Sequence, residues 1–307
     1  MLLATTRNRV NIFKVVARHL CSSVFICGSL AFSSTQSTAA PITLTDDVGR
    51  NVALKEPARR MVTLAPFLTE LVYAAGVGDR MVGVSAYSDY PPEARKLPIV
   101  SSAVGVSLEQ VAALHPDLVL AWRDSIRNED IERMSRLGMA VFVATGRRLE
   151  DVPNLLTRIG EMTGADVSHL RSKFQTELST LRARYAGKPR IDVFLEIWHK
   201  PLTTISGSHF MNDALDICGL RNVFRDHEGV APVVSWEELY ARNPSVIVGT
   251  GSAANEAEFL ANWKERPTLS AVKSGRLEWI DADTLQRPTT RTPRGIATLC
   301  ERLDRRR

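Results

Sequence analysis

Two tyrosines lie close together in the segment SAYSDYPPEARKLP, residues 85–98. Tyr87 and Tyr90 stand on either side of an acidic residue, and tandem prolines follow directly. Tandem prolines exclude a helix or a central strand, so this segment is predicted to be a loop after the strand-like MVGV, residues 81–84. Local packing is the ordinary explanation for the two rings. The alternative is that they wall a binding site, because loops on a rigid scaffold carry much of a protein's function.

Two tryptophans follow apolar runs that are typical of buried strands. Trp122 ends DLVLAW, so it is expected at the carboxyl end of a strand, where α/β sheets hold ligands. Trp198, in FLEIWHKPL, occupies the corresponding place in the second half of the chain. Each ring alone also fits a core position. Together with Tyr87 and Tyr90, they predict a ligand site lined with aromatic surface.

Two arginines, Arg287 and Arg291, lie in the proline-containing stretch DADTLQRPTTRTPRG near the end of the chain. They are either ordinary surface charges or groups that recognise amides or phosphates at the mouth of a cleft.

Signatures of catalysis are missing from the sequence, which has no Walker loop, GxSxG elbow, HExxH or CxxC motif. Four of the six histidines lie in the two predicted lobes, and none is spaced with another as a helical metal pair: His115, His199, His209 and His227. We therefore predict a binding protein with no catalytic residues, no metal ligands and no cofactor.

The segments that position these residues form an internal repeat, with one copy in each half of the chain. VSLEQVAALHPDLVL at 106–120 returns as VSWEELYARNPSVIV at 234–248. In each copy a serine, Ser107 or Ser235, is predicted to cap a short helix and to form a capping box with the residue three positions later. A proline then ends the helix, and an apolar strand begins.

A second pair of similar segments supports the repeat. FLTELVYAAGV at 67–77 resembles FMNDALDICGL at 210–220, and each predicts a helix that ends at a glycine. A strand-like segment precedes each one, RMVTLAP in the first half and PLTTISG in the second. Alternating strands and helices predict two similar α/β lobes, each with a parallel sheet.

A long helix is predicted between the two lobes, at residues 165–187, because apolar residues recur there at helical spacing without a break. Two lobes joined by such a strut create a cleft, the usual place for a small ligand. The expected division is a signal peptide at 1–40, a first lobe at 41–160, the connecting helix at 161–188 and a second lobe at 189–307.

The first forty residues have the pattern of a secretory signal peptide cleaved after Ala40. A basic start precedes the apolar run at 20–32, which is too short to span a bilayer. An uncleaved anchor and a lipid anchor at Cys27 are the alternatives. Subtracting the four basic residues of this segment from the net charge of +5 leaves +1, so charge gives no argument for nucleic acid.

Only Cys218 and Cys300 remain after the signal is removed. An even pair in an exported protein predicts one disulfide, and two buried free thiols are the alternative.

The chain resembles the periplasmic vitamin B12-binding proteins of bacterial ABC importers, within the larger class of iron-chelate and B12 solute-binding proteins. The similarity covers nearly all of residues 41–307. Its most specific motifs are TLAPFLTEL, GVSAYSDYPPEA, SLEQVAALHPDLVLAWR, DICGLRNVF and TLCERL. The resemblance implies two Rossmann-like lobes joined by one long rigid helix, with the ligand in the cleft between them.

The resemblance also implies roles for individual residues. Tyr87, Trp122, Asp283 and Arg287 match ligand-face positions of the family, and the family's disulfide matches Cys218 with Cys300. Surface glutamates that dock the lobes onto a dimeric permease match Glu109 and Glu237, the glutamates that the two repeats share. The residues alone indicate only that each glutamate lies at the start of a helix, where its negative charge interacts favourably with the helix dipole.

Two positions depart from the family pattern, because Ala103 and Ala231 stand where the well-known B12 protein has tryptophan. A related corrinoid could then be preferred, or Trp198 could compensate. Haem-binding relatives usually carry a tyrosine in the stretch that here reads SSAVGVS, which argues against haem.

These observations predict a monomeric periplasmic receptor that delivers a corrinoid, vitamin B12, to the permease of an ABC importer. An iron–siderophore receptor of the same class is the first alternative. An exported enzyme that uses the cleft between the lobes is the second.

Overall fold

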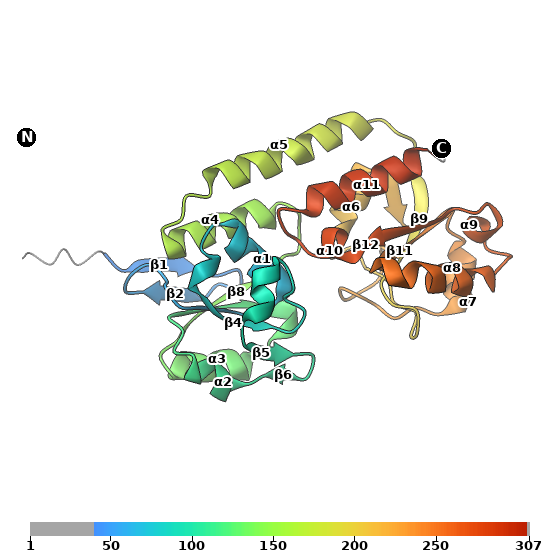
Figure 1. Ribbon diagram of the computed structural model, residues 1–307. Helices are drawn as coiled ribbons and strands as arrows, with labels where there is room; N and C mark the ends of the chain where they lie inside the picture. Colours follow the sequence, from blue (N-terminus) through green and yellow to red (C-terminus); the bar gives the residue numbers. More distant parts are fainter. Residues whose placement is uncertain (1–39, 306–307) are drawn as a thin grey trace, which may run out of the picture. The chain divides into compact units, whose positions relative to one another are not determined.

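The computed structural model describes residues 40–305, which form two largely parallel β-sheets flanked by helices (Figure 1). We call the elements from β1 to α4 the N-terminal lobe and those from β9 to α11 the C-terminal lobe, with helix α5 between them. The predicted α/β fold with two lobes is confirmed. The predicted signal peptide lies outside the described residues, apart from Ala40.

The sheet of the N-terminal lobe has the strand order β6-β5-β4-β3-β7-β8. All neighbours are parallel except β6, which is antiparallel to β5. An antiparallel hairpin, β1 with β2, precedes this sheet and contacts it at β8. The strands are β1 (Ile42–Thr45), β2 (Asn51–Leu54), β3 (Met61–Thr63), β4 (Met81–Ser85), β5 (Ile99–Ser102), β6 (Gly105–Val106), β7 (Leu118–Trp122) and β8 (Ala140–Ala144).

The sheet of the C-terminal lobe is entirely parallel and has the order β10-β9-β11-β12. Parallel strands are joined by crossover helices, which cover the faces of each sheet. The strands are β9 (Ile191–Glu196), β10 (Leu220–Asn222), β11 (Val246–Gly251) and β12 (Leu277–Asp281).

Eleven α-helices and four short 3-10 helices occur among residues 40–305. The α-helices are α1 (Pro66–Ala74), α2 (Leu108–Ala113), α3 (Asn128–Arg136), α4 (Asp151–Thr163), α5 (Ser168–Tyr185), α6 (Met211–Ile217), α7 (Trp236–Arg242), α8 (Glu256–Lys264), α9 (Ser270–Lys273), α10 (Ala282–Leu285) and α11 (Thr292–Asp304). The 3-10 helices are η1 (Gly78–Arg80), η2 (Pro92–Lys96), η3 (Arg123–Ser125) and η4 (Ala253–Asn255).

The repeated segments fold alike, as predicted. The Ser107 hydroxyl accepts a hydrogen bond from the Gln110 amide at the start of α2, and the Ser235 hydroxyl accepts one from the Glu238 amide at the start of α7. These bonds satisfy amide groups that a helix leaves unpaired in its first turn. Each helix is followed by its expected strand, β7 or β11.

Two local predictions are wrong, the capping boxes and one strand in the second half of the chain. At α2 the Ser107 amide donates to the Val100 carbonyl and not to the Gln110 side chain. The Glu238 carboxylate does not complete a capping box, because it binds His227 and Arg242 instead. The segment PLTTISG is a loop rather than a strand, and within it Thr203 forms isolated bridges with Trp198 and Val233. The strand of this half, β9, ends before that loop.

The glycine after each helix of the second repeat adopts the predicted left-handed conformation. Gly76 follows α1 with a φ of 79°, and Gly219 follows α6 with a φ of 70°. A side chain is unfavourable in this conformation, so glycine allows the chain to leave the helix and turn back toward the sheet.

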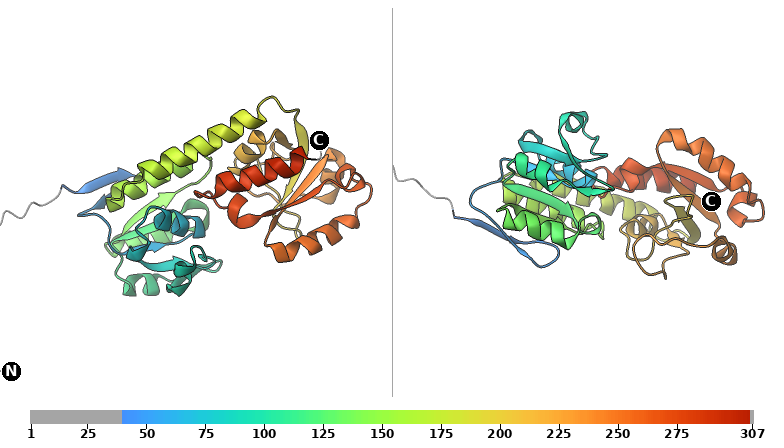
Figure 2. Two further views of the ribbon diagram at one scale, coloured as in Figure 1. Left: turned by 45° about the horizontal axis from the view of Figure 1, so that its top comes forward. Right: turned by 90° about the horizontal axis from the view of Figure 1, so that it is seen from below.

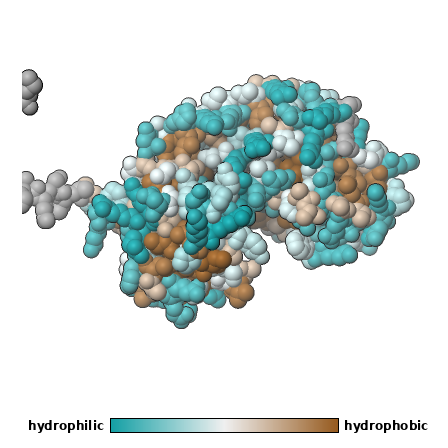
Figure 3. Space-filling model, viewed as in Figure 1, coloured by the Kyte–Doolittle hydropathy of each residue, from teal (hydrophilic) through white to brown (hydrophobic). Residues whose placement is uncertain are grey.

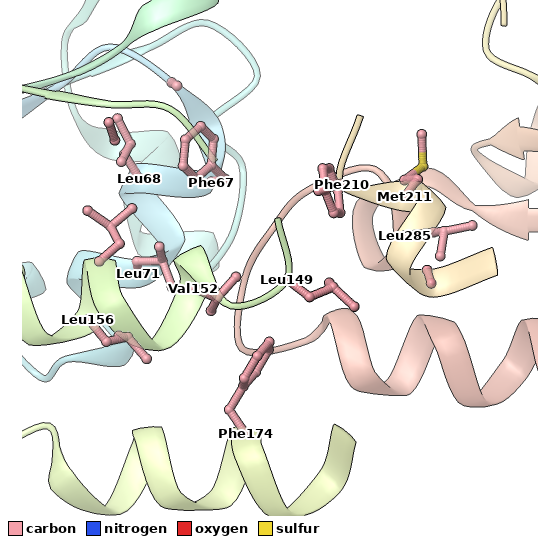
Figure 4. Packing of buried hydrophobic residues seen from close by; sticks show 14 of the residues in the cluster. Phe67, Leu68, Leu71, Leu149, Val152, Leu156, Phe174, Phe210, Met211 and Leu285 are labelled. Atoms are coloured by element: carbon pink, nitrogen blue, oxygen red, sulfur yellow. The ribbon is translucent and has the colours of Figure 1, made fainter. Parts of the chain in front are cut away.

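The apolar core consists of three clusters. One lies on a single face of the N-terminal sheet and one on a single face of the C-terminal sheet. The largest cluster draws residues from both lobes and from α5, which contributes Phe174 (Figure 4). In the same view, Phe67 of α1 and Phe210 beside α6 extend this cluster from the two lobes. Burial of apolar surface in one shared cluster holds the lobes together.

Helix α5 runs along both lobes and packs against α4, α6 and α11 (Figure 2). It has no interruption, as predicted, and it buries Phe174, Leu178 and Leu181. A disulfide joins Cys218, at the end of α6, to Cys300 in α11. Among residues 40–305, no helix combines the length and the apolar character that a membrane crossing requires.

Candidate functional site

A pocket of about 130 Å³ lies between the two lobes. We call it the interlobe pocket. Phe67, Trp122 and Arg147 line it from the N-terminal lobe, and His209, Phe210 and Arg287 line it from the C-terminal lobe. The pocket is largely apolar, and its few polar groups come from both lobes, which is the usual character of a small-molecule site.

Trp122 is the last residue of β7, at the carboxyl end of the sheet where sequence reasoning placed it. Its indole Nε1 donates a hydrogen bond to the Thr145 carbonyl at 3.0 Å. Its ring meets that of Phe67 edge to face, with centroids 5.9 Å apart. The hydrogen bond and the ring contact fix the indole as a wall of the interlobe pocket.

Tyr87 is held in a strained backbone conformation in the loop after β4. Its φ is 63°, a left-handed value that residues with a side chain rarely adopt, and its side chain is 77% exposed. The adjoining Ser88 hydroxyl bonds the hydroxyls of Ser85 and Thr69, and Thr69 also bonds Thr63. This buried chain of hydroxyls fixes the loop, so an exposed aromatic ring is presented from a rigid support.

Tyr90, the second ring of this loop, is covered by an arginine. The Arg291 guanidinium carbon lies 3.9 Å from the centre of the Tyr90 ring, within cation–π distance. Tyr90 therefore packs against the protein itself, which agrees with local packing, the ordinary explanation for this ring.

Arg287 and Arg291 are neither free surface charges nor free donors for a ligand. Both bind the carboxylate of Glu70 in α1, whose side chain is only 3% exposed. The Arg287–Glu70 distance is 2.9 Å, and Arg291 donates two hydrogen bonds, of 2.9 and 2.7 Å. This ion pair connects the C-terminal lobe to the N-terminal lobe beside the interlobe pocket.

Arg287 also contacts the tyrosine loop. It donates to the Asp89 carboxylate at 2.9 Å and to the Tyr87 carbonyl at 3.2 Å, and it pairs with Asp283 at 3.1 Å. Burial by itself lowers the pKa of Arg287, but the hydrogen bonds to Glu70 and Asp89 raise it on balance. Asp283, predicted as a ligand residue, contacts Arg287 and is not among the residues that line the interlobe pocket.

Trp198 lines a different cavity from Trp122. This C-terminal cavity, of about 500 Å³, is also bordered by Glu196, His199 and Trp279. Trp198 is 65% exposed, and its Nε1 donates to the Lys200 carbonyl. Gln286 lines both the C-terminal cavity and the interlobe pocket, so the two spaces adjoin.

A buried carboxylate lies at the base of the C-terminal cavity. Glu196 accepts a hydrogen bond of 2.6 Å from the Trp263 indole and lies 3.3 Å from His199 Nδ1. Burial raises the pKa of Glu196, although the charge of His199 and the bond from Trp263 oppose this change. Among residues 40–305, no three His, Cys, Asp or Glu side chains gather as a metal site would require.

Sequence reasoning missed Phe67, Glu70, Arg147 and His209. Arg147 follows β8, so the rule that selected Trp122, a position after the carboxyl end of a parallel strand, would have selected it too. His209 was counted as one of the lobe histidines but was assigned no role. No sequence signal indicates Glu70, because its partners lie more than two hundred residues away.

The two glutamates of the repeat lie away from both cavities. Glu109 and Glu237 are each the second residue of their helix, α2 and α7, and both are exposed. Neither has an ion-pair partner in the part of the chain that the structure describes. Both carboxylates are therefore accessible to a partner molecule.

Apolar side chains are also exposed on the N-terminal lobe. Figure 3, drawn from the direction of Figure 1, shows apolar surface on the N-terminal lobe around β5 and β6. Val104, in the turn between these strands, is almost fully exposed, and Ile99 is 60% exposed. Contiguous exposed apolar surface is typical of an interaction site.

The family described as periplasmic binding protein matches residues 61–284. The vitamin B12-binding protein of Vibrio parahaemolyticus is 32% identical over 251 residues, which cover 81% of this chain and 90% of that relative. The crystal structure of the periplasmic vitamin B12-binding protein of Vibrio cholerae superposes with a TM-score of 0.71 at 31% identity, covering 81% of this chain and 97% of that one.

A third similar structure is a possible iron-binding, periplasmic solute-binding protein from Staphylococcus epidermidis, with 25% identity and a TM-score of 0.68. It covers 80% of this chain and 98% of that one. Because the family match spans most of the sequence and the relatives align along nearly their whole length, the chain belongs to the periplasmic binding protein family.

Proposed function

We propose that this protein captures a corrinoid, vitamin B12, in the periplasm and delivers it to the permease of an ABC importer. One observation supports this most directly: an aromatic interlobe pocket, walled by Trp122 and Phe210, in a chain similar to B12-binding proteins over most of its length. A corrin macrocycle has apolar faces and a rim of carboxamides. It therefore needs aromatic walls and a few polar groups, which the two adjoining cavities provide.

The ligand in this proposal is larger than the interlobe pocket. A volume of about 130 Å³ holds an edge or a side chain of a macrocycle, so the remainder would extend past Tyr87 and toward Trp198. Trp198 bridges Thr203, which in turn bridges Val233, close to Ala231. The backbone segment that carries Trp198 is thus connected to the segment of Ala231, where the well-known B12 protein has tryptophan, and we propose that Trp198 compensates for that missing ring.

Arg287 has a supporting role in this proposal rather than that of a ligand donor. Its contacts with Glu70, Asp89 and Tyr87 use most of its N–H groups and hold the tyrosine loop against the C-terminal lobe. Tyr87, Trp122 and Trp198 then meet the ligand directly. Asp283 contributes through its ion pair with Arg287.

The remaining parts of the proposal concern export and docking. Residues 1–40 serve as a cleaved signal, and a Cys218–Cys300 disulfide fits an oxidising compartment. Residues 41–160 and 189–307 act as lobes around the connecting helix at 161–188. Glu109 and Glu237 present one carboxylate per lobe to the permease, the protein acts as a monomer, and it catalyses no reaction.

An iron–siderophore receptor is the second candidate. It is favoured by the similarity to the possible iron-binding protein and by the cationic side chain of Arg147 at the interlobe pocket. Titration calorimetry of the mature protein with cyanocobalamin, a panel of ferric siderophores and haem separates the candidates. We expect one cyanocobalamin per chain and no heat of binding from the others. Saturable binding of a siderophore, without cyanocobalamin binding, would overturn the proposed ligand.

A further inference from the structure

The interlobe pocket is mostly apolar, but two N–H groups at its edge have no acceptor among the residues that the structure describes. One is Nε of Arg147, which is buried. The other is Nε2 of His209, whose ring lines the same pocket. Burial of the unpaired Arg147 Nε is unfavourable, so its presence at a cavity indicates a group that arrives with the ligand, and His209 Nε2 offers a second donor at the same pocket.

The protonation of His209 follows from its neighbours. The Met211 amide donates a hydrogen bond of 3.2 Å to His209 Nδ1, so that nitrogen offers its lone pair and carries no proton. Burial, and to a lesser degree the charge of Arg147, lowers the pKa of His209 to about 4. The neutral ring therefore carries its proton on Nε2. Stacking on Phe210, with ring centroids 4.9 Å apart, fixes the orientation of the ring.

Arg147 is also fixed before a ligand arrives. Its amide donates to the Asp151 carboxylate at 2.6 Å, and its Nη2 donates to Asp124 at 2.7 Å. These contacts hold the guanidinium at the pocket while leaving Nε unused. A donor that is already oriented loses little conformational freedom when it binds a ligand.

We propose that His209 Nε2 and Arg147 Nε form a subsite that recognises an acceptor oxygen of the ligand, and that His209 does not coordinate the ligand's metal. This inference rests on the proposed function. A corrinoid offers carboxamide carbonyls around the macrocycle and a phosphate diester in its nucleotide arm. Metal coordination by Nε2 requires a lone pair on that nitrogen, and the bond from the Met211 amide favours the opposite tautomer.

The first test compares ligand affinities by calorimetry with cyanocobalamin and with dicyanocobinamide, which lacks the nucleotide phosphate. His209→Phe keeps an aromatic ring but removes the donor, and His209→Gln restores an N–H group. We expect His209→Phe to weaken cyanocobalamin binding about three- to tenfold and His209→Gln to recover most of this loss. Substitution of the exposed His169 by phenylalanine is the matched control and should leave the affinity unchanged.

Arg147→Met is the second test, because methionine keeps much of the side-chain volume without any donor. We expect a loss of about 10- to 100-fold, since hydrogen bonds from charged donors are the stronger ones. Arg148→Met is the control, because this neighbour pairs with Asp213 and does not line the interlobe pocket. A loss that persists with dicyanocobinamide identifies a carboxamide as the acceptor, and a loss confined to cyanocobalamin identifies the phosphate.

The outcomes separate this inference from the proposed function. If the wild type binds neither probe, the proposed function fails and the subsite fails with it. If the wild type binds but neither His209→Phe nor Arg147→Met weakens binding, only the subsite is wrong. The visible spectrum of aquocobalamin gives an independent readout. A wild-type spectrum showing imidazole coordination to cobalt, lost in His209→Phe, would overturn the assignment of His209 as a donor, and an unchanged spectrum supports it.

Discussion

Arg291 of the C-terminal lobe donates two hydrogen bonds, of 2.9 and 2.7 Å, to the buried carboxylate of Glu70 in the N-terminal lobe. Arg287 adds a third, of 2.9 Å, to the same carboxylate. The lobes are therefore joined beside the interlobe pocket by charges as well as by apolar packing and by α5. Because Arg287 also binds the Tyr87 carbonyl, the same contact sets the position of a proposed ligand residue.

Glu70→Gln is predicted to destabilise the protein strongly. The change leaves two half-buried guanidinium groups facing a neutral amide, and removing one partner of a buried ion pair costs about 3–5 kcal/mol. Urea unfolding followed by circular dichroism measures this change. Asp283→Asn is the control, because its pair with Arg287 is partly exposed, and it should cost about 1 kcal/mol or less. Equal stabilities of Glu70→Gln and the wild type would show that the interlobe ion pair adds nothing.

Tyr87→Ala and Trp122→Ala are each predicted to weaken cyanocobalamin binding by about 1–3 kcal/mol, the range for truncating a buried aromatic anchor. Calorimetry measures the affinities, and tryptophan fluorescence should be quenched as Trp122 meets the chromophore. Tyr240→Ala removes an exposed ring of α7 outside both cavities and serves as the control. Wild-type affinity in both site variants would place the ligand elsewhere.

The sequence was sufficient to predict elements that local physics determines. A capping serine, a helix-ending proline and an apolar run specify α2 with β7 and α7 with β11, because each of these signals acts within a few residues. The position of Trp122 followed from the same logic, since the end of a buried strand in a parallel sheet is also an end of the sheet.

The parts of the site that were missed depend on contacts between distant residues. Glu70 forms its ion pairs with Arg287 and Arg291, which lie more than two hundred residues later in the chain. No local pattern in a single sequence predicts such a contact. The loop PLTTISG has the composition of a strand, but its amides bind loop partners, such as the Pro232 carbonyl for Thr204. Tertiary contacts there outweigh the local preference of the residues.

The Cys218–Cys300 disulfide is predicted to leave no free thiol in protein purified from the periplasm. The cysteines are 82 residues apart, and closing a loop of that size is worth about 4 kcal/mol in the chain-entropy treatment. Alkylation under denaturing conditions, followed by mass spectrometry, counts the free thiols. Reduced protein should unfold at a lower urea concentration. Two alkylated cysteines without prior reduction would contradict both the pairing and export.

Acid is predicted to destabilise the wild type more than His209→Gln. The pKa of His209 is about 4 when folded and about 6.5 when unfolded, so between these values the unfolded chain binds more protons at this site. The free energy of unfolding therefore falls as the pH drops from 6.5 to 4, by about 3 kcal/mol at 1.36 kcal/mol per pKa unit. Arg147, Asp124 and Arg287 line the same pocket and are unchanged in the variant. The difference between the two stability curves isolates His209, and parallel curves from pH 7 to pH 4 would contradict its lowered pKa.

Charge reversal of the two repeat glutamates tests the docking proposal. Glu109→Arg combined with Glu237→Arg should abolish B12 uptake in a transport assay, because each lobe would place a like charge against the permease. Calorimetry should still give the wild-type affinity, since neither residue lines a cavity. A single reversal should give partial loss, because the two lobes would meet equivalent surfaces of a two-fold permease.

Glu129→Arg is the matched control for these reversals. Glu129 is exposed and is the second residue of α3, as Glu109 and Glu237 are of α2 and α7, so all three changes oppose a helix dipole by the same few tenths of a kcal/mol. Only the repeat glutamates should affect uptake if they bind the permease. Normal transport by the double variant would show that Glu109 and Glu237 only stabilise the starts of their helices and do not bind the permease. Loss of B12 affinity in that variant would instead place these glutamates at the ligand site and contradict their assignment to an exposed docking surface.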